Sequence, residues 1–385
     1  TSEILRLVMK TRFFIQNQCV MLQNYFKIAL RNLFKDHLYT LINITGLALG
    51  MMSVLLILFY VKDELSYDTF FKDHDNIHRI AIDIKTQDNK NLLFAPVTSM
   101  LPEALRDYSQ VAKTTRLYPA GSRLVSAGPE KVFYETTFAW ADPNVFEVFS
   151  FQFLHGNPKT ALDAPMKMVV TRATAKKYFG TTAVVGKTLK VNEVDYQITG
   201  VIEDLPSNAH FQVGFLASLT EHYNKEWFPN WHATMFYTYV KLKPGTDVKA
   251  FEAQIHDIAD KYVGNEIRQN AQYYRFFLQP LTSIHLHPDL RYELGKNNSY
   301  RQIQILSAIA IIILIIAAFN FINLATARAT RQAKEVGIRK TVGSQRKHLI
   351  LQFMLESLLL CTLAMVLALM GIWLVLPWFN QIADK

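Results

Sequence analysis

Three long apolar stretches divide the chain. No Asp, Glu, Lys or Arg occurs in residues 38–61, 302–327 and 357–383. A helix of about 20 apolar residues, rising about 1.5 Å per residue, crosses the hydrocarbon core of a bilayer. The pattern therefore predicts three transmembrane helices, which we place at 38–62, 302–327 and 349–379.

The long segment between the first two spans mixes two periodicities. Alternation of apolar and polar positions, typical of strands, occurs in several places: Ile80, Ile82 and Ile84; Leu189 and Val191; Ile198, Val201 and Ile202; Tyr237, Tyr239 and Lys241. Helical spacing follows a turn in which Asp247 is the predicted N-cap, with Phe251, Ile255, Ile258 and Tyr262 on one face. We predict an α+β domain over 63–301, with two subdomains divided near residues 120 and 215.

The distribution of charge sets the topology. The chain has 385 residues, of which 50% are hydrophobic and 19% charged, and its net charge is +9. Residues 1–37 carry +4 and residues 328–348 carry +6, whereas residues 63–301 hold 26 cations and 27 anions. Cations concentrated beside membrane spans follow the positive-inside rule and are not the basic surface of a nucleic-acid-binding protein. We therefore expect a multi-pass membrane protein with a cytoplasmic N-terminus, an extracytoplasmic domain at 63–301 and a cytoplasmic loop at 328–348.

The two ends of the chain give further expectations. Residues 1–37 form a cytoplasmic tail in which Phe26, Leu30 and Leu33 recur at helical spacing, as in an interfacial amphipathic helix or a charged leader that only orients the first span. We expect Met21 to be the natural start of the protein. Residues 380–385 form a truncated end after an odd number of spans, so we expect a fragment or one half of a longer protein.

Three apparent catalytic or metal-binding motifs in the 63–301 domain do not meet their chemical requirements. Gly180 and Gly186 resemble a phosphate-binding loop, but five residues separate them instead of four, and the sequence that follows predicts a strand where a helix is required. His285 and His287 lie on one face of a predicted extended segment without further ligands at a usable spacing. Residues 207–210 contain no nucleophile elbow. We predict no catalytic residue, no metal site and no cofactor.

Small and polar residues within the spans predict helix packing. Gly46 and Gly50 form a small-xxx-small pair, which allows a second helix to approach closely. Asn320 and Asn323 lie one turn apart in the second span and can bond to a neighbouring helix. For Glu356, in the third helix, we favour an ion pair with a loop cation over a proton or substrate relay.

The cytoplasmic loop has the most specific pattern in the chain. Glu335 precedes Arg339 by four residues, which supports a helix, while Gly343 followed by Ser344 predicts a helix end and a new N-cap. A basic helix therefore continues from the second span, stops at Gly343, and is followed by the helix of the third span. Such a rigid pair could transmit force from a cytoplasmic partner; alternatively, its cations only bind anionic lipid.

These motifs resemble a known family. The sequences FNFINLATAR at 319–328 and KEVGIRKTVG at 334–343 are similar to the signature of MacB-type, FtsX-like ABC transporter permeases. Segments 32–36, 46–50, 68–71 and 77–79 fit the same family, and 145–149 and 200–206 are similar to its periplasmic core domain. Some members of the family contain two such repeats and resemble sequences from Bacteroidota, and this chain resembles their first repeat. The resemblance implies a location in the bacterial inner (plasma) membrane.

The resemblance implies a permease that hydrolyses no ATP itself. A separate ABC ATPase subunit would bind ATP and contact the loop through Lys334, Glu335, Val336, Gly337, Ile338, Arg339, Lys340 and Gly343. The permease, as a dimer of permeases or of repeats in the lipid bilayer, would relay motion to the extracytoplasmic domain for export or extraction of a peptide, antibiotic or lipoprotein. A membrane-anchored sensor or scaffold, regulating a partner such as a cell-wall hydrolase, is the alternative, and an enzyme is a third hypothesis against which the failed motifs count.

Overall fold

The structure is a computed structural model that describes residues 26–28, 30–31, 33–34, 37–342 and 346–383. The chain forms two compact units, one within residues 1–62 and 303–385 and the other Asp63–Gln302. The second unit is called the ectodomain, after its predicted location.

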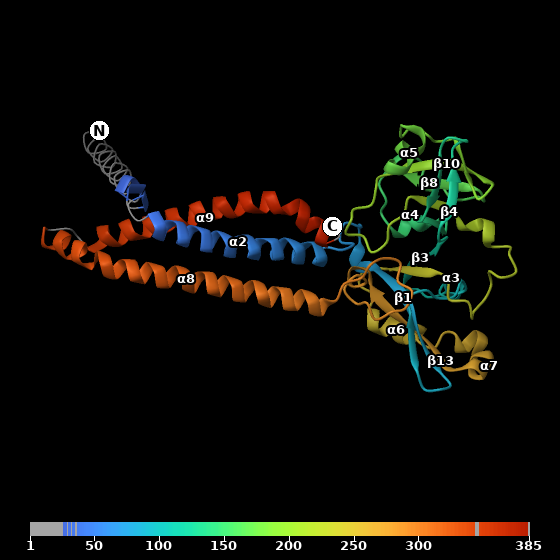
Figure 1. Cartoon of the computed structure of the whole chain (residues 1–385). Coiled ribbons are helices and arrows are strands. Elements are labelled where there is room, and N and C mark those ends of the chain that lie inside the picture. Colours follow the sequence, from blue (N-terminus) through green and yellow to red (C-terminus); the bar gives the residue numbers. More distant parts are fainter. Residues whose placement is uncertain (1–25, 29, 32, 35–36, 343–345, 384–385) are drawn as a thin grey trace, which may run out of the picture. The chain divides into compact units, whose positions relative to one another are not determined.

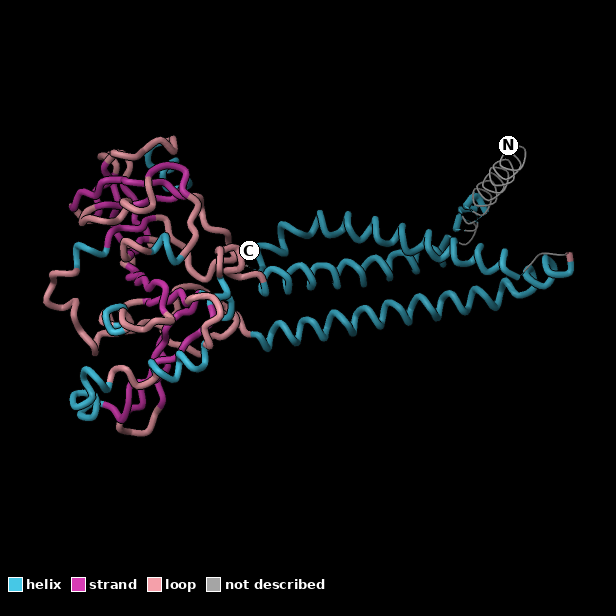
Figure 2. Tube along the Cα trace, turned by 180° about the vertical axis from the view of Figure 1, so that it is seen from behind, coloured by secondary structure: helices cyan, strands magenta, loops and turns pink. Residues whose placement is uncertain are grey.

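The first unit contains three long helices, α2 (His37–Leu65), α8 (Tyr300–Thr341) and α9 (Arg346–Ala383). α2 and α8 run a few residues into the ectodomain. Among the described residues, these three are the helices that are long and apolar enough to cross a membrane, which confirms the three predicted apolar helices. Figure 2 shows the three helices side by side. The described residues between 26 and 34 are also helical, and the rest of the predicted tail lies outside the described residues.

The ectodomain is built on one mixed sheet. Its strand order is β13-β1-β12-β3-β6-β11-β8-β10-β9-β4-β5, with β2 beside β1 and β7 beside β10. The pairs β8/β10 and β6/β11 are parallel, and the other strand pairs are antiparallel. The strands are β1 (Ile77–Thr86), β2 (Asn91–Phe94), β3 (Val111–Pro119), β4 (Arg123–Ser126), β5 (Val132–Glu135), β6 (Phe138–Ala141), β7 (Phe153–Gly156), β8 (Lys167–Thr171), β9 (Thr188–Val191), β10 (Val194–Ile202), β11 (Phe215–Ser218), β12 (Tyr237–Leu242) and β13 (Ala271–Pro280).

Side-chain alternation divides the sheet into two buried faces. Along β1, Ile77 and Ala81 enter one apolar cluster, whereas Ile80 and Ile82 enter another on the opposite face. The first face is covered by α4 (Val145–Val148) and the loop after β13. The second is covered by α5 (Arg172–Phe179) at one end and by α6 (Val248–Ile255) and α7 (Asp260–Asn270) at the other; the short helix α3 (Leu101–Ala104) joins this last cluster (Figure 1).

The predicted strands are all present, but the subdomain division near 215 is wrong. β11 and the loop that follows it, up to Phe236, pack into the apolar cluster around α5. The chain leaves this end of the sheet only at β12, and the two ends share one continuous sheet. Periodicity revealed the strands but not which of them pair.

Asp247 caps α6 as predicted, since its side chain accepts a hydrogen bond from the Ala250 N–H. The predicted single helix is nevertheless two. α6 ends at Ile255, and Tyr262 lies in α7 with its side chain half exposed.

Candidate functional site

The glycine pair of α2 lies against α8. A Cβ atom added to Gly50 would lie 2.7 Å from Ala317 Cβ, and one added to Gly46 would lie 2.9 Å from Asn320 Nδ2. Carbon atoms in van der Waals contact are about 3.5–4.0 Å apart, so only glycine at position 50 permits this approach. The structure therefore brings together three of the four residues to which we assigned helix packing.

The other face of α2 contacts α9. Ala48 packs with Ala364 and Ala368 in one small apolar cluster, and Met52 lies against Gly371. Small residues on both helices allow close packing in lipid, where burial from water provides no driving force. α2 thus packs against both α8 and α9.

Asn323 takes no part in this contact. Its side chain is exposed, and within the described residues neither Asn320 nor Asn323 forms a hydrogen bond to another helix. Asn320 is instead the flexible neighbour that covers Gly46. The cross-helix hydrogen bonds that we expected of these two amides are not made in this bundle.

The loop motif lies mostly on α8 itself. This helix runs without a break through Lys334, Glu335, Val336, Gly337, Ile338, Arg339 and Lys340 to Thr341, whereas Gly343 lies outside the described residues. Val336 is half-buried, but Gly337, Ile338 and Lys340 are exposed. The side chains of Lys334, Glu335 and Arg339 are not among those described, so the pairing of Glu335 with Arg339 stays a prediction.

A cavity of about 380 Å³ lies between the three helices. Tyr39 of α2, Ala325, Ala329 and Ala333 of α8, and Glu356 of α9 are among its lining residues. Glu356 is only 4% exposed. The cations of 328–339 lie outside the described side chains, so the expected ion pair of Glu356 also stays a prediction.

Sequence reasoning missed two buried polar residues of the same bundle. Asn43 and Gln352 are 1% and 5% exposed, on α2 and α9 respectively. Both residues could have been found in the sequence as polar positions within apolar helices. A polar group in a membrane usually faces protein or a polar cavity.

The rejected motifs of the ectodomain have structural roles. Gly180 ends α5 in the left-handed conformation, Gly186 adopts a positive φ in the turn before β9, and no helix follows that could hold a phosphate. His285 and His287 lie in turns after β13, so the predicted extended segment is wrong there. Among the described residues, no three His, Cys, Asp or Glu side chains form a group suited to a metal ion.

His285 belongs to a buried polar cluster that the sequence did not reveal. We call Glu64, Asp68, Arg79, His210, Tyr239, His285 and Glu293 the anchor cluster. His285 Nε2 lies 2.8 Å from Glu64 Oε2, and the His285 ring stacks on Tyr67 with centroids 3.4 Å apart. The cluster joins the segment that follows α2 to the loop that precedes α8.

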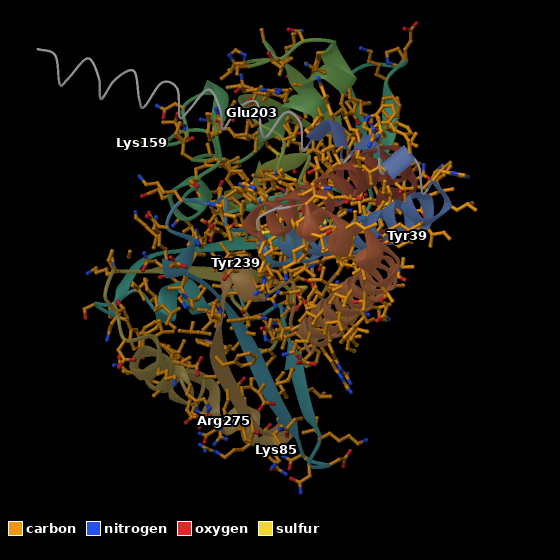
Figure 3. All side chains as sticks on the ribbon, turned by 90° about the vertical axis from the view of Figure 1, so that its left-hand side faces the viewer. Tyr39, Lys85, Lys159, Glu203, Tyr239 and Arg275 are labelled. Carbon is orange, nitrogen blue, oxygen red and sulfur yellow. The ribbon has the colours of Figure 1, made fainter. Side chains whose placement is uncertain are left out.

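Arg79 and His210 lie at the centre of this cluster. The fully buried Arg79 guanidinium donates to both carboxylate oxygens of Glu293, at 2.5 and 2.7 Å, a bidentate geometry that satisfies a buried charge. His210 lies between Asp68, whose Oδ1 is 2.9 Å from Nδ1, and Tyr239, whose hydroxyl oxygen is 2.7 Å from Nε2. Burial raises the pKa of Tyr239, which lies on β12 and is labelled in Figure 3.

Comparison with known sequences identifies the class of protein. The profile described as "MacB-like periplasmic core domain" matches residues 40–258, and that described as "FtsX-like permease C-terminal" matches residues 307–384. Since the first match covers more than half of the chain, the protein belongs to the family of MacB-like, FtsX-like transporter permeases. It is a membrane protein, and this family is not one of catalytic enzymes.

Individual relatives share only part of their length with the chain. The macrolide export ATP-binding/permease protein MacB of Bdellovibrio bacteriovorus is 18% identical over 49% of this chain and 28% of its own length. MacB of Salmonella paratyphi A is 24% identical over 56% of this chain and 32% of its own length. The chain thus spans about a third of these relatives.

A solved structure shares the fold of the ectodomain. A domain of a permease protein from Porphyromonas gingivalis superposes with a TM-score of 0.50 and 24% identity, over 55% of this chain and 91% of that one. The resemblance confirms the α+β fold and carries no information on substrate.

Proposed function

We propose that the chain is the permease subunit of an ABC transporter, which relays the ATP-driven motion of a separate ATPase to an extracytoplasmic domain. The moved substrate is an envelope peptide, antibiotic or lipoprotein. The observation that carries the proposal is the continuity of α8, together with the family membership of the chain.

α8 has the dimensions of a lever. Its 42 residues span about 63 Å at about 1.5 Å per residue, roughly twice the hydrocarbon thickness of a bilayer. It begins at the end of the ectodomain and includes the basic segment, so a displacement at Lys340 moves the whole rod. A helix broken at the membrane surface would absorb the same displacement by bending.

The exposed part of α8 offers a protein contact. Ile338 is 57% exposed among cations, and Gly337 leaves open space where a side chain could insert. Attraction to anionic lipid needs the cations alone, whereas docking on an ATPase uses an apolar anchor surrounded by charges. We therefore assign the partner contact to Lys334–Lys340 with Gly343.

The anchor cluster supports transmission into the sheet. Glu64 lies in the last turn of α2 and Arg79 in β1, and their partners His285 and Glu293 belong to the loop that precedes α8. Breaking one partner of a buried charge pair costs about 3–5 kcal/mol, so these segments move together with the strands. The ectodomain thus responds as one body to its two connections.

The test replaces Glu335 and Arg339 together by alanine in the chain copurified with the ATPase subunit proposed as its partner. We expect ATP hydrolysis by the complex to fall to that of the ATPase alone, with membrane insertion unchanged. The matched control replaces Arg346 and Lys347 by alanine, which removes two positive charges, whereas the first change leaves the net charge the same. If the first variant stimulated ATP hydrolysis as fully as the original chain, or if the control lost more of that stimulation, the segment would only attract lipid.

A further inference from the structure

The outermost strand of the ectodomain sheet has an open edge. β5 is the last strand of the order and, among the strands that the structure describes, pairs only with β4. Its central residues Val132, Phe133 and Tyr134 are 43%, 38% and 77% exposed. Proteins usually shield such an edge, because its unpaired backbone groups can pair with another chain.

The register of the hairpin shows which backbone groups face outward. Ala127 N donates to Lys131 O at 3.0 Å, and in an antiparallel ladder hydrogen-bonded pairs alternate with pairs that do not bond. Phe133, opposite Val125, therefore bonds to β4, while Val132 and Tyr134 direct their N–H and C=O groups to the open edge.

The sequence of β5 is complementary to itself. In an antiparallel pair of two β5 strands centred on Phe133, Val132 of each strand lies opposite Tyr134 of the other, and Lys131 lies opposite Glu135. Aromatic with β-branched residues and opposite charges are both favourable cross-strand pairs. The outward-facing residues 132 and 134 would form the hydrogen-bonded pairs, as the alternation requires.

The two charged residues of the proposed pair, Lys131 and Glu135, already have partners within the chain, and each keeps further bonding capacity. Lys131 Nζ donates to the Tyr178 carbonyl oxygen at 2.6 Å, which uses one of its three N–H donors. Lys177 and Tyr178 donate to Glu135 Oε1 at 2.6 and 2.7 Å, and within the described residues Oε2 accepts no hydrogen bond. These bonds hold Glu135 in place without using its second oxygen. The same two donors fix β5 against α5.

We propose that β5 pairs with β5 of a second copy of this chain, centred on Phe133, through a two-fold axis perpendicular to the sheet. The contact is short and smaller than a standard protein interface, so it forms reversibly and depends on the high effective concentration of two copies in one membrane. It does not depend on the coupling proposed for α8.

Disulfide crosslinking of single cysteines tests this register in the full chain in its membrane. With Cys19 and Cys361 replaced by serine and alanine, Phe133→Cys and Tyr134→Cys are oxidised mildly. At the proposed axis, Phe133 faces its own copy in a non-hydrogen-bonded pair, about 4.5 Å between Cα atoms, which suits a disulfide. We expect dimers at position 133 to form at least tenfold faster than at position 134.

A second pair of variants covers the case in which Phe133→Cys fails to fold. Val132→Cys and Tyr134→Cys, coexpressed with different tags, should give a mixed dimer faster than either gives its own. Lys131→Glu should suppress that dimer, whereas Lys190→Glu on β9, which is separated from β5 by β4, should leave it unchanged. Equal rates at all positions, or no difference between the two charge reversals, would overturn the proposed pairing.

Discussion

The close approach of α2 and α8 predicts the effect of one added methyl group. In Gly50→Ala the new Cβ would lie 2.7 Å from Ala317 Cβ, more than 1 Å inside the ordinary carbon contact of about 4 Å. Neither atom can rotate away, since both are attached directly to helix backbone. The two helices must therefore move apart.

Overpacking of this kind costs about 1–3 kcal/mol. Alanine is a better helix former than glycine by up to about 1 kcal/mol, which offsets part of that cost. We expect Gly50→Ala to destabilise the bundle by about 1–2 kcal/mol. Gly46→Ala is the matched control, because its new Cβ meets only the end of the Asn320 side chain, which can turn aside.

The assay is reversible unfolding by SDS in mixed micelles, completed as a double-mutant cycle. Ala317→Gly removes the opposing methyl group, so the double variant Gly50→Ala with Ala317→Gly should recover most of the lost stability. A Gly50→Ala protein as stable as the original, or a double variant with the plain sum of the two single losses, would refute the packing argument.

Three further predictions concern the ectodomain and the topology. Asp247→Ala should lower ectodomain stability by about 1 kcal/mol, while Asp247→Asn, which also caps, should have little effect; equal losses in a denaturant titration would exclude the cap. Lys159 points outward from the ectodomain (Figure 3), so Lys159→Cys should react with an impermeant thiol reagent in spheroplasts. Thr341→Cys should not react. The reverse result would show that the ectodomain faces the cytoplasm. Burial lowers the pKa of His78, so at acidic pH the unfolded chain binds more protons than the folded chain, and the free energy of unfolding should fall as the pH drops below about 6.5. In His78→Gln the free energy of unfolding should fall less between about pH 7.5 and 5. The same pH dependence in the variant and the original protein would argue against a buried neutral imidazole.

Local sequence patterns alone predicted many of the helices and strands of this protein. The absence of charge over three apolar stretches predicted three spanning helices, because a bilayer imposes a length and a composition on any segment that crosses it. Alternation along Ile80, Ile82 and Ile84 predicted a strand, and Asp247 predicted a cap, because these signals are spaced within a few residues. The family resemblance followed from two short sequence motifs, at 319–328 and 334–343.

Tertiary structure decided which of these elements meet. Arg79 and Glu293 are 214 residues apart, and nothing near either residue indicates a buried ion pair. The glycine pair predicted that a helix would approach, but the identity of that helix, through Ala317, depends on how three spans pack. The pairing of the strands likewise depends on tertiary structure. Because β12 pairs with β1, the chain leaves the α5 end of the sheet only after Phe236, and not near residue 215 as predicted. Periodicity determines which face of an element is apolar, whereas pairing depends on the free energy of all faces packed together.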